Sequence, residues 1–125
     1  QLSEILSRES SIEAFQNLSF GDLWQILFPE KAPLYALRVN DFALVTFPGE
    51  PICELGLAVQ ASLRQAGVAH PCVAALTTEE IGYILTKEEY RKSGYEVTAS
   101  FYGETLGALL LERAQALGVA MAAKK

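Results

Sequence analysis

Histidine and cysteine are scarce in this 125-residue sequence, which has one histidine, His70, and two cysteines. Zinc enzymes commonly hold their metal with two or three imidazoles, and a Ser-His-Asp hydrolase needs one imidazole as its base. The sequence therefore excludes a self-contained zinc site with two or three histidines, and a Ser-His-Asp site would depend on His70 alone. Cys53 and Cys72 form no Cys-x-x-Cys pair, so we expect two buried free thiols, although their spacing also permits a bridge.

Basic residues are also few, with 10 Lys and Arg against 15 Asp and Glu and a net charge of -5. They are scattered along the chain, whereas nucleic-acid binding needs clustered positive charge. We therefore expect no nucleic-acid partner. No apolar run approaches the about 20 residues of a transmembrane helix, and the first residues do not resemble a signal peptide. The sequence predicts a soluble chain without a transmembrane segment and leaves its compartment unknown.

Half of the residues are hydrophobic, which suffices for a core at this length. The apolar pattern predicts one domain over residues 1–125, with a helical lead-in and linker over 1–33, a core over 34–118 and a tail over 119–125. Two short amphipathic helices are expected over 1–28. The predicted fold class is α/β: a small mixed sheet, made of a hairpin and a β-helix-β unit and covered by helices, as in a fragment of a larger α/β domain.

The core pattern contains five principal elements. In chain order they are strands over 34–39 and 42–47, a helix over 52–66, a strand over 72–76 and a helix over 106–117. The dipeptide Asn40-Asp41 tolerates the positive φ of a tight hairpin turn, and Gly67 and Gly118 are expected to end the two helices. Apolar residues along the second strand predict burial on both faces. Thr77 and Thr86 each begin a capping-box pattern, which favours a short helical turn.

Glu50 follows the second strand, at the sheet edge where α/β proteins place ligands. It precedes Pro51 in what the pattern predicts to be the first helical turn, where backbone amides would stabilise the carboxylate. Both a helix-capping role and a ligand or base role are compatible with this position. For His70, which precedes a proline before a strand, a surface or capping role is expected.

Tyrosines are concentrated in the second half of the chain, at Tyr83, Tyr90, Tyr95 and Tyr102. Each tyrosine is compatible with half-buried packing, and also with a phenol that donates, accepts or, at a metal, ionises.

Three segments together resemble the later part of the neutral/alkaline ceramidase-like catalytic domain. They are 42–51, which ends in Pro-Gly-Glu-Pro; 81–86, which contains Gly-Tyr; and 94–100, which contains Tyr-Glu twelve residues after the first tyrosine. The intervening residues 86–90 are similar to a Thr-x-Glu-x-Tyr segment of that family. The resemblance covers roughly residues 35–117.

The resemblance implies that Glu50 and Tyr83 are zinc ligands and that Tyr95 is a catalytic residue, which stabilises the oxyanion formed during amide hydrolysis. Family members take two further zinc-binding histidines and a serine-containing segment from an earlier half of the domain, which this sequence does not contain. The resemblance therefore implies the C-terminal portion of a zinc-dependent amidohydrolase, inactive as an isolated chain. It implies zinc only together with the histidine-bearing half, an amide-containing lipid as substrate, and a secreted or membrane-surface parent protein.

Two other functions are compatible with the residues. The first is a non-catalytic α/β binding or assembly module, which keeps the fold and forms a homo-oligomer through an exposed sheet edge or apolar face. The second is an unrelated enzyme that uses Cys53 or Cys72 as nucleophile and His70 as its base.

Overall fold

The computed structural model describes residues 28–77 and 79–123. The chain divides into two compact units, of which the second spans Lys31–Lys125 and contains every element described below. The helices expected over 1–28 lie outside the described residues, apart from the last position. Residues 28–35 have no regular helix or strand. The strand that the sequence predicts over 34–39 therefore begins two residues later, at Ala36.

A three-stranded mixed sheet forms the centre of this unit. β1 (Ala36–Val39) and β2 (Phe42–Thr46) make an antiparallel hairpin, and β4 (His70–Ala74) pairs in parallel with β2. Asn40 has a φ of 53° in the hairpin turn, which confirms its predicted role. β4 begins earlier than predicted because the His70 N–H donates to a carbonyl of that turn at 3.0 Å.

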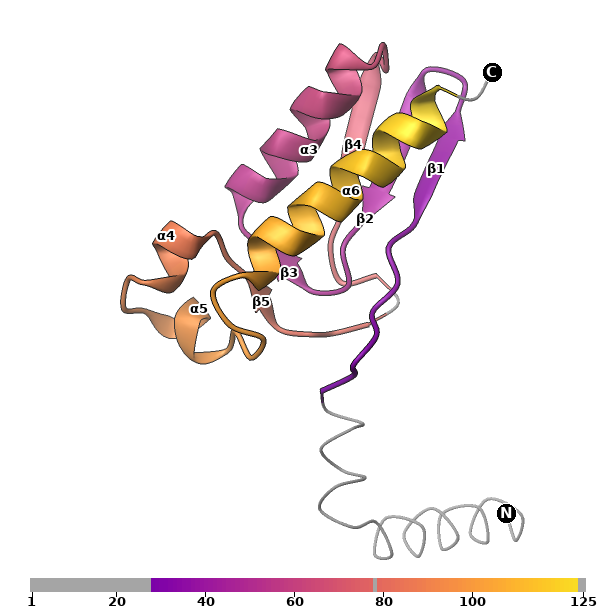
Figure 1. Cartoon of the computed structure of the whole chain (residues 1–125). Helices are drawn as coiled ribbons and strands as arrows, with labels where there is room; N and C mark the ends of the chain where they lie inside the picture. The colour runs from indigo at the N-terminus through magenta and orange to yellow at the C-terminus, as the bar shows by residue number, and fades with distance from the viewer. Residues whose placement is uncertain (1–27, 78, 124–125) are drawn as a thin grey trace, which may run out of the picture. The chain divides into compact units, whose positions relative to one another are not determined.

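A second sheet of two short strands follows the carboxyl ends of β2 and β4. β3 (Glu50–Pro51) and β5 (Tyr83–Ile84) pair in parallel, and helix α3 (Cys53–Gln65) begins just after β3. Two single-turn helices, α4 (Lys87–Tyr90) and α5 (Tyr95–Thr98), lie next to this small sheet (Figure 1). The β2-α3-β4 succession is the predicted β-helix-β unit, and the small sheet adds a feature that the sequence pattern did not indicate.

Of the two capping-box patterns, the one at Thr86 begins a helix. The Thr86 Oγ1 accepts a hydrogen bond from the Glu89 N–H at 3.2 Å and caps α4. The Thr77 Oγ1 instead donates to the Phe47 carbonyl oxygen at 3.0 Å, and no helix begins there among the described residues. The prediction at Thr77 was wrong because a distant backbone carbonyl, 30 positions earlier, engages the hydroxyl.

Helices α3 and α6 (Leu106–Ala122) lie side by side over one face of the three-stranded sheet (Figure 1). The core between these layers consists mainly of Ala43, Val45 and Phe47 from β2 and its extension, Leu55, Val59 and Leu63 from α3, and Leu110, Ala114 and Ala122 from α6. None of the described helices combines the length and apolarity that a membrane span requires.

Helix α6 continues beyond Gly118, where the sequence predicted its end. A Cβ at Gly118 would lie 2.9 Å from the Leu63 Cδ2 and 3.1 Å from the Val45 Cγ2, so this glycine permits close packing of the helix on α3 and β2. At the far end, an Arg38 Nη1 donates to the Ala122 carbonyl oxygen at 2.7 Å. A cation there interacts favourably with the helix C-terminus, which supports the longer helix.

The opposite face of the three-stranded sheet is apolar over β1 and β2, and the described residues leave much of it exposed. Leu37 lies opposite Leu44, and Val39 lies opposite Phe42, in the β1–β2 hairpin. Side chains alternate between the two faces of a sheet, so these pairs point away from the helices. Leu37 and Val39 are each 55% exposed and Phe42 is 41% exposed. Of the residues that predicted burial on both faces, Ala43, Val45 and Phe47 are buried and Leu44 is half-buried. We call Leu37, Val39, Phe42 and Leu44 the outer face.

Candidate active site

The three site residues indicated by the sequence motifs lie together in the structure. Glu50 and Tyr83 are register partners in the parallel β3–β5 pair, so their side chains project from the same face of the small sheet. The Tyr95 ring, from α5, lies edge-on to the Tyr83 ring with centroids 5.9 Å apart and an interplanar angle of 76°. A carboxylate and two phenols therefore converge at the carboxyl end of the parallel strands β2 and β4.

The local structure at Glu50 differs from the sequence prediction. Pro51 lies in β3 and not in a first helical turn, and Ile52 is the N-cap of α3. The chain stays extended this far because the Ile52 N–H donates to the Ile84 carbonyl oxygen at 3.1 Å. Glu50 is consequently positioned by strand pairing, and the expected support of its carboxylate by helix N-terminal amides is wrong.

Two glycines allow the backbones at the site to approach closely. A Cβ at Gly49 would overlap the Gly82 carbonyl oxygen, and a Cβ at Gly82, where φ is 81°, would overlap the Ala99 carbonyl oxygen. The Tyr83 N–H donates to that same Ala99 oxygen at 3.0 Å. The sequence pattern alone did not single out Gly49 or Gly82 as structural residues. Their location directly before Glu50 and Tyr83 was the available signal that they position the site.

The environment of Tyr83 favours its neutral phenol. Burial raises the pKa of Tyr83 above its usual value, and the negative charge of Glu50 raises it further, followed by contributions from Tyr95, Glu96 and Glu80. The face that carries Glu50 and Tyr83 is thus rich in negative charge, and a bound cation would offset this charge.

The described residues fit part of a zinc site. Carboxylate oxygens are ordinary zinc ligands, and a phenol can ionise at a metal. Catalytic zinc sites usually have three protein ligands, yet residues 28–77 and 79–123 contain no group of three or more His, Cys, Asp or Glu that could hold a metal. Glu50 and Tyr83 offer two oxygen donors on one face of the small sheet, fewer than the three protein ligands usual at catalytic zinc.

The cysteine and histidine positions do not support a Cys-His pair based on Cys53. Both cysteines are free. Cys53 is the first residue of α3 and is exposed, contrary to the expected burial. A hydrogen bond to Glu54 and its charge raise the pKa of the Cys53 thiol, which reduces its thiolate fraction. His70 is exposed, as predicted, and follows the other end of α3, roughly 20 Å along a helix of this length. Cys72 is half-buried, and its thiol contacts the adjacent Val73 carbonyl.

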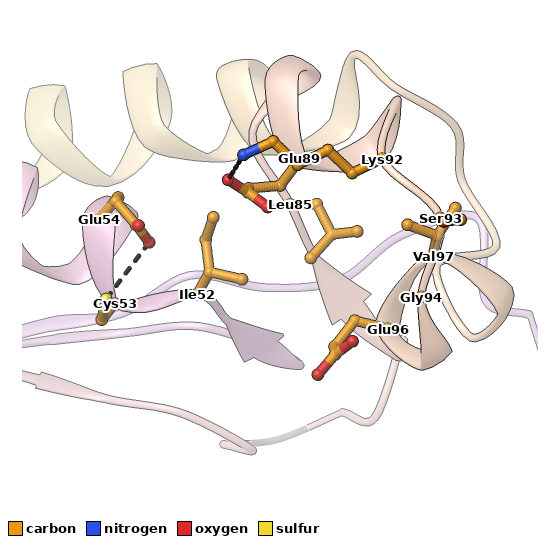
Figure 2. Close-up of a pocket in the computed structure, with 10 residues that line it drawn as sticks. All are labelled: Ile52, Cys53, Glu54, Leu85, Glu89, Lys92, Ser93, Gly94, Glu96 and Val97. Atoms are coloured by element: carbon orange, nitrogen blue, oxygen red, sulfur yellow. Dashed lines mark hydrogen bonds and ion pairs between the residues drawn. The ribbon is translucent and has the colours of Figure 1, made fainter.

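A pocket of about 380 Å³, which the sequence did not indicate, lies between the start of α3 and the short helices α4 and α5 (Figure 2). Its lining includes Ile52 and Leu85, which follow Glu50 and Tyr83 by two residues each. Ile52 and Leu85 lie directly after the two strands, and the Ile52 N–H donates to the Ile84 carbonyl oxygen at 3.1 Å, so the pairing that positions Glu50 and Tyr83 also holds this part of the pocket wall. The apolar residue two positions after each motif residue was the signal that could have revealed it.

The comparisons with known proteins agree with the motif reading. No family model matches the chain. Neutral ceramidase B of Dictyostelium discoideum is 31% identical over 90 residues, which cover 67% of this chain and 12% of that protein. The crystal structure of neutral ceramidase from Pseudomonas aeruginosa matches 73% of this chain and 15% of its own with a TM-score of 0.67 and 22% identity. The structure of a ceramidase complexed with C2 matches 84% of this chain and 20% of its own, with a TM-score of 0.64 and 22% identity.

The fold is thus a small mixed α/β unit of a kind that recurs within much larger ceramidase chains, which confirms the predicted fold class. The chain itself is neutral ceramidase-like in sequence and in fold, which confirms the resemblance based on the motifs. It spans between 12% and 20% of the length of these three relatives.

Proposed function

We propose that this chain supplies part of the active site of a zinc-dependent amidohydrolase, with Glu50 and Tyr83 as two zinc ligands and Tyr95 as a catalytic residue. One observation carries the proposal: Glu50 is the register partner of Tyr83, and the Tyr95 ring packs against the Tyr83 ring. Its support is the location at the carboxyl ends of parallel strands, a common ligand site in α/β proteins. The similar proteins are neutral ceramidases, so the proposed substrate is an amide-containing lipid.

Each of the three residues has a definable role in this proposal. Zinc, when bound, would supply Lewis-acid polarisation of the amide carbonyl and a lowered pKa for water. Glu50 and Tyr83 would hold the ion with oxygen ligands from adjacent strands. Tyr95 is 71% exposed, so its hydroxyl can reach a docked substrate and donate to the charge that develops on the amide oxygen.

The isolated chain is expected to show no amidase activity, because Glu50 and Tyr83 provide two ligands where a catalytic zinc site usually needs three. We use 'full-length protein' for the longer chain of which we propose this sequence to be a part. It is expected to contain about one zinc per chain, the stoichiometry of a single such site, and to hydrolyse N-acyl amides. Metal analysis and an amidase assay on the full-length protein and the isolated chain provide the test. A full-length protein that hydrolyses amides without any bound metal would overturn the zinc proposal.

Glu50→Gln in the full-length protein should lower the zinc content, since a neutral amide is a poorer ligand than a carboxylate. The matched control is Glu112→Gln, which changes an exposed glutamate on α6 and should leave the zinc content unchanged.

The outer face favours a second candidate function, an assembly module. Exposed apolar surface of this kind is typical of an interaction site, and the chain spans a small fraction of its relatives. We propose that the outer face packs against a further part of a longer protein. When that part is absent, the isolated chain should associate with itself, because the outer face would otherwise remain in water.

Leu37→Gln should reduce self-association and hydrophobic-dye binding of the isolated chain, because it places a polar group on the outer face. Leu57→Gln is the matched control: Leu57 lies on α3 and is 59% exposed, against 55% for Leu37. Light scattering and dye fluorescence measure the two effects. A monomeric wild-type chain that binds no dye would count against the assembly module.

A further inference from the structure

We infer that the pocket beside Glu50 and Tyr83 holds the group that a substrate carries next to its scissile amide, and that its acidic lining favours an uncharged or cationic group over a carboxylate. This inference rests on the proposed function, because it takes the Glu50 and Tyr83 pair as the reaction centre. It adds a substrate class and the residues that select it.

The position of the pocket places it within reach of the reacting bond. Ile52 and Leu85 lie just beyond the two strands, two residues after Glu50 and Tyr83, and two residues of extended chain span at most roughly 7 Å. On the α5 side, Glu96 lines the pocket and directly follows Tyr95. A substituent on the amide nitrogen or carbonyl carbon, a few bonds long, therefore reaches the pocket from the centre.

The pocket has an apolar part that can bind hydrocarbon. Ile52, Leu85 and Val97 contribute apolar side chains, and Figure 2 shows the first two between the polar residues at either end. Small-molecule sites commonly combine such an apolar surface with a few placed polar groups. An acyl or alkyl segment can remove this surface from water.

The charged lining is predominantly negative. Glu54, Glu89 and Glu96 line the pocket together with one cation, Lys92. The Lys92 Nζ already contacts the Glu89 Oε1 at 2.6 Å and the Glu88 Oε1 at 3.7 Å, so two carboxylates offset its charge.

Glu54 and Glu96 have no ion pair with any residue in the described part of the chain. The Glu54 Oε2 accepts a hydrogen bond from the neutral Cys53 thiol at 3.3 Å (Figure 2). A substrate carboxylate would meet these two charges without a free cation to balance it, whereas a hydroxyl or ammonium can donate to them. Electrostatic repulsion of one ligand class is an effective source of specificity.

The test compares three substrates of the full-length protein that share one acyl chain: N-lauroyl-ethanolamine, N-lauroyl-ethylenediamine and N-lauroyl-β-alanine. We expect kcat/KM for the hydroxyl and ammonium substrates to exceed that for the carboxylate substrate by about tenfold or more, mainly through KM. Glu54→Gln with Glu96→Gln should reduce this ratio by at least about threefold, and Glu112→Gln should not change it. An unchanged ratio in the double variant would overturn the inference.

Glu50→Gln separates this inference from the proposed function. If Glu50→Gln abolishes hydrolysis while the double variant keeps the wild-type substrate ratio, the pocket inference alone fails. If Glu50→Gln retains full activity, the proposed function fails. Calorimetric titration of the Glu50→Gln protein with hexylamine and hexanoate adds a measurement without turnover. Hexylamine should bind more tightly, and tighter binding of hexanoate would contradict the inference.

Discussion

Tyr95→Phe in the full-length protein is expected to lower kcat for amide hydrolysis by about 10²- to 10³-fold with little change in KM, the usual effect of removing one oxyanion donor. The substitution keeps the ring that packs edge-on against Tyr83 and removes the hydroxyl. Because Tyr95 is 71% exposed, its substitution should have little effect on folding. Steady-state kinetics on one N-acyl amide measures the effect.

Tyr90→Phe is the matched control, since it removes a phenol hydroxyl from the neighbouring helix α4, at a position that does not line the pocket. It should keep wild-type kcat. Zinc content should be unchanged in both variants, because neither residue is a proposed ligand. A wild-type kcat in Tyr95→Phe would show that the Tyr95 hydroxyl takes no part in the reaction. It would not bear on Glu50 and Tyr83 as zinc ligands.

Gly82→Ala is expected to destabilise the chain by about 3 kcal/mol, a large effect for one methyl group. Two causes combine. Gly82 has a φ of 81°, which L side chains rarely adopt, and a Cβ there would overlap the Ala99 carbonyl oxygen and lie 3.1 Å from the Phe101 ring. Relief of this overlap would separate β5 from the segment after α5, which also displaces Tyr95. Urea unfolding measures the loss.

Alanine substitutions at two other glycines distinguish the effect of backbone conformation from that of steric overlap. Gly67 has a φ of 85° but no neighbour within 4 Å of a Cβ, so Gly67→Ala should cost about 1 kcal/mol from backbone conformation alone. Gly56 lies inside α3 with equally open space, so Gly56→Ala should stabilise the chain by about 0.5–1 kcal/mol. A cost at Gly82 no greater than that at Gly67 would contradict the close backbone approach.

Much of the fold was predictable because local patterns agree with the tertiary arrangement. The turn at Asn40 forms as expected, since its positive φ suits a tight hairpin. The apolar positions Leu55, Val59 and Leu63 recur at helical spacing and are the buried residues of α3. Parallel pairing of β2 and β4 follows, because a helix between two strands can return the chain in the same direction.

The wrong predictions are those in which a distant contact replaced a local preference. Gly118, a helix terminator by its local pattern, lies within α6 because the helix packs closely on Leu63. Pro51 lies in a strand because the neighbouring backbone pairs with Ile84. Thr77 donates to the Phe47 carbonyl and does not cap a helix. The partners in each case are too far away in the sequence for a local pattern to reveal.

The sequence by itself determined the fold class, the family resemblance and the candidate residues Glu50, Tyr83 and Tyr95, since strand and helix periodicity and motif spacing are properties of the chain order. Only the tertiary structure decided that these three residues lie together and that a pocket with acidic residues adjoins them. Their contact depends on parallel pairing of two short strands, 33 residues apart, and on close backbone approach at Gly49 and Gly82, none of which a local pattern reveals.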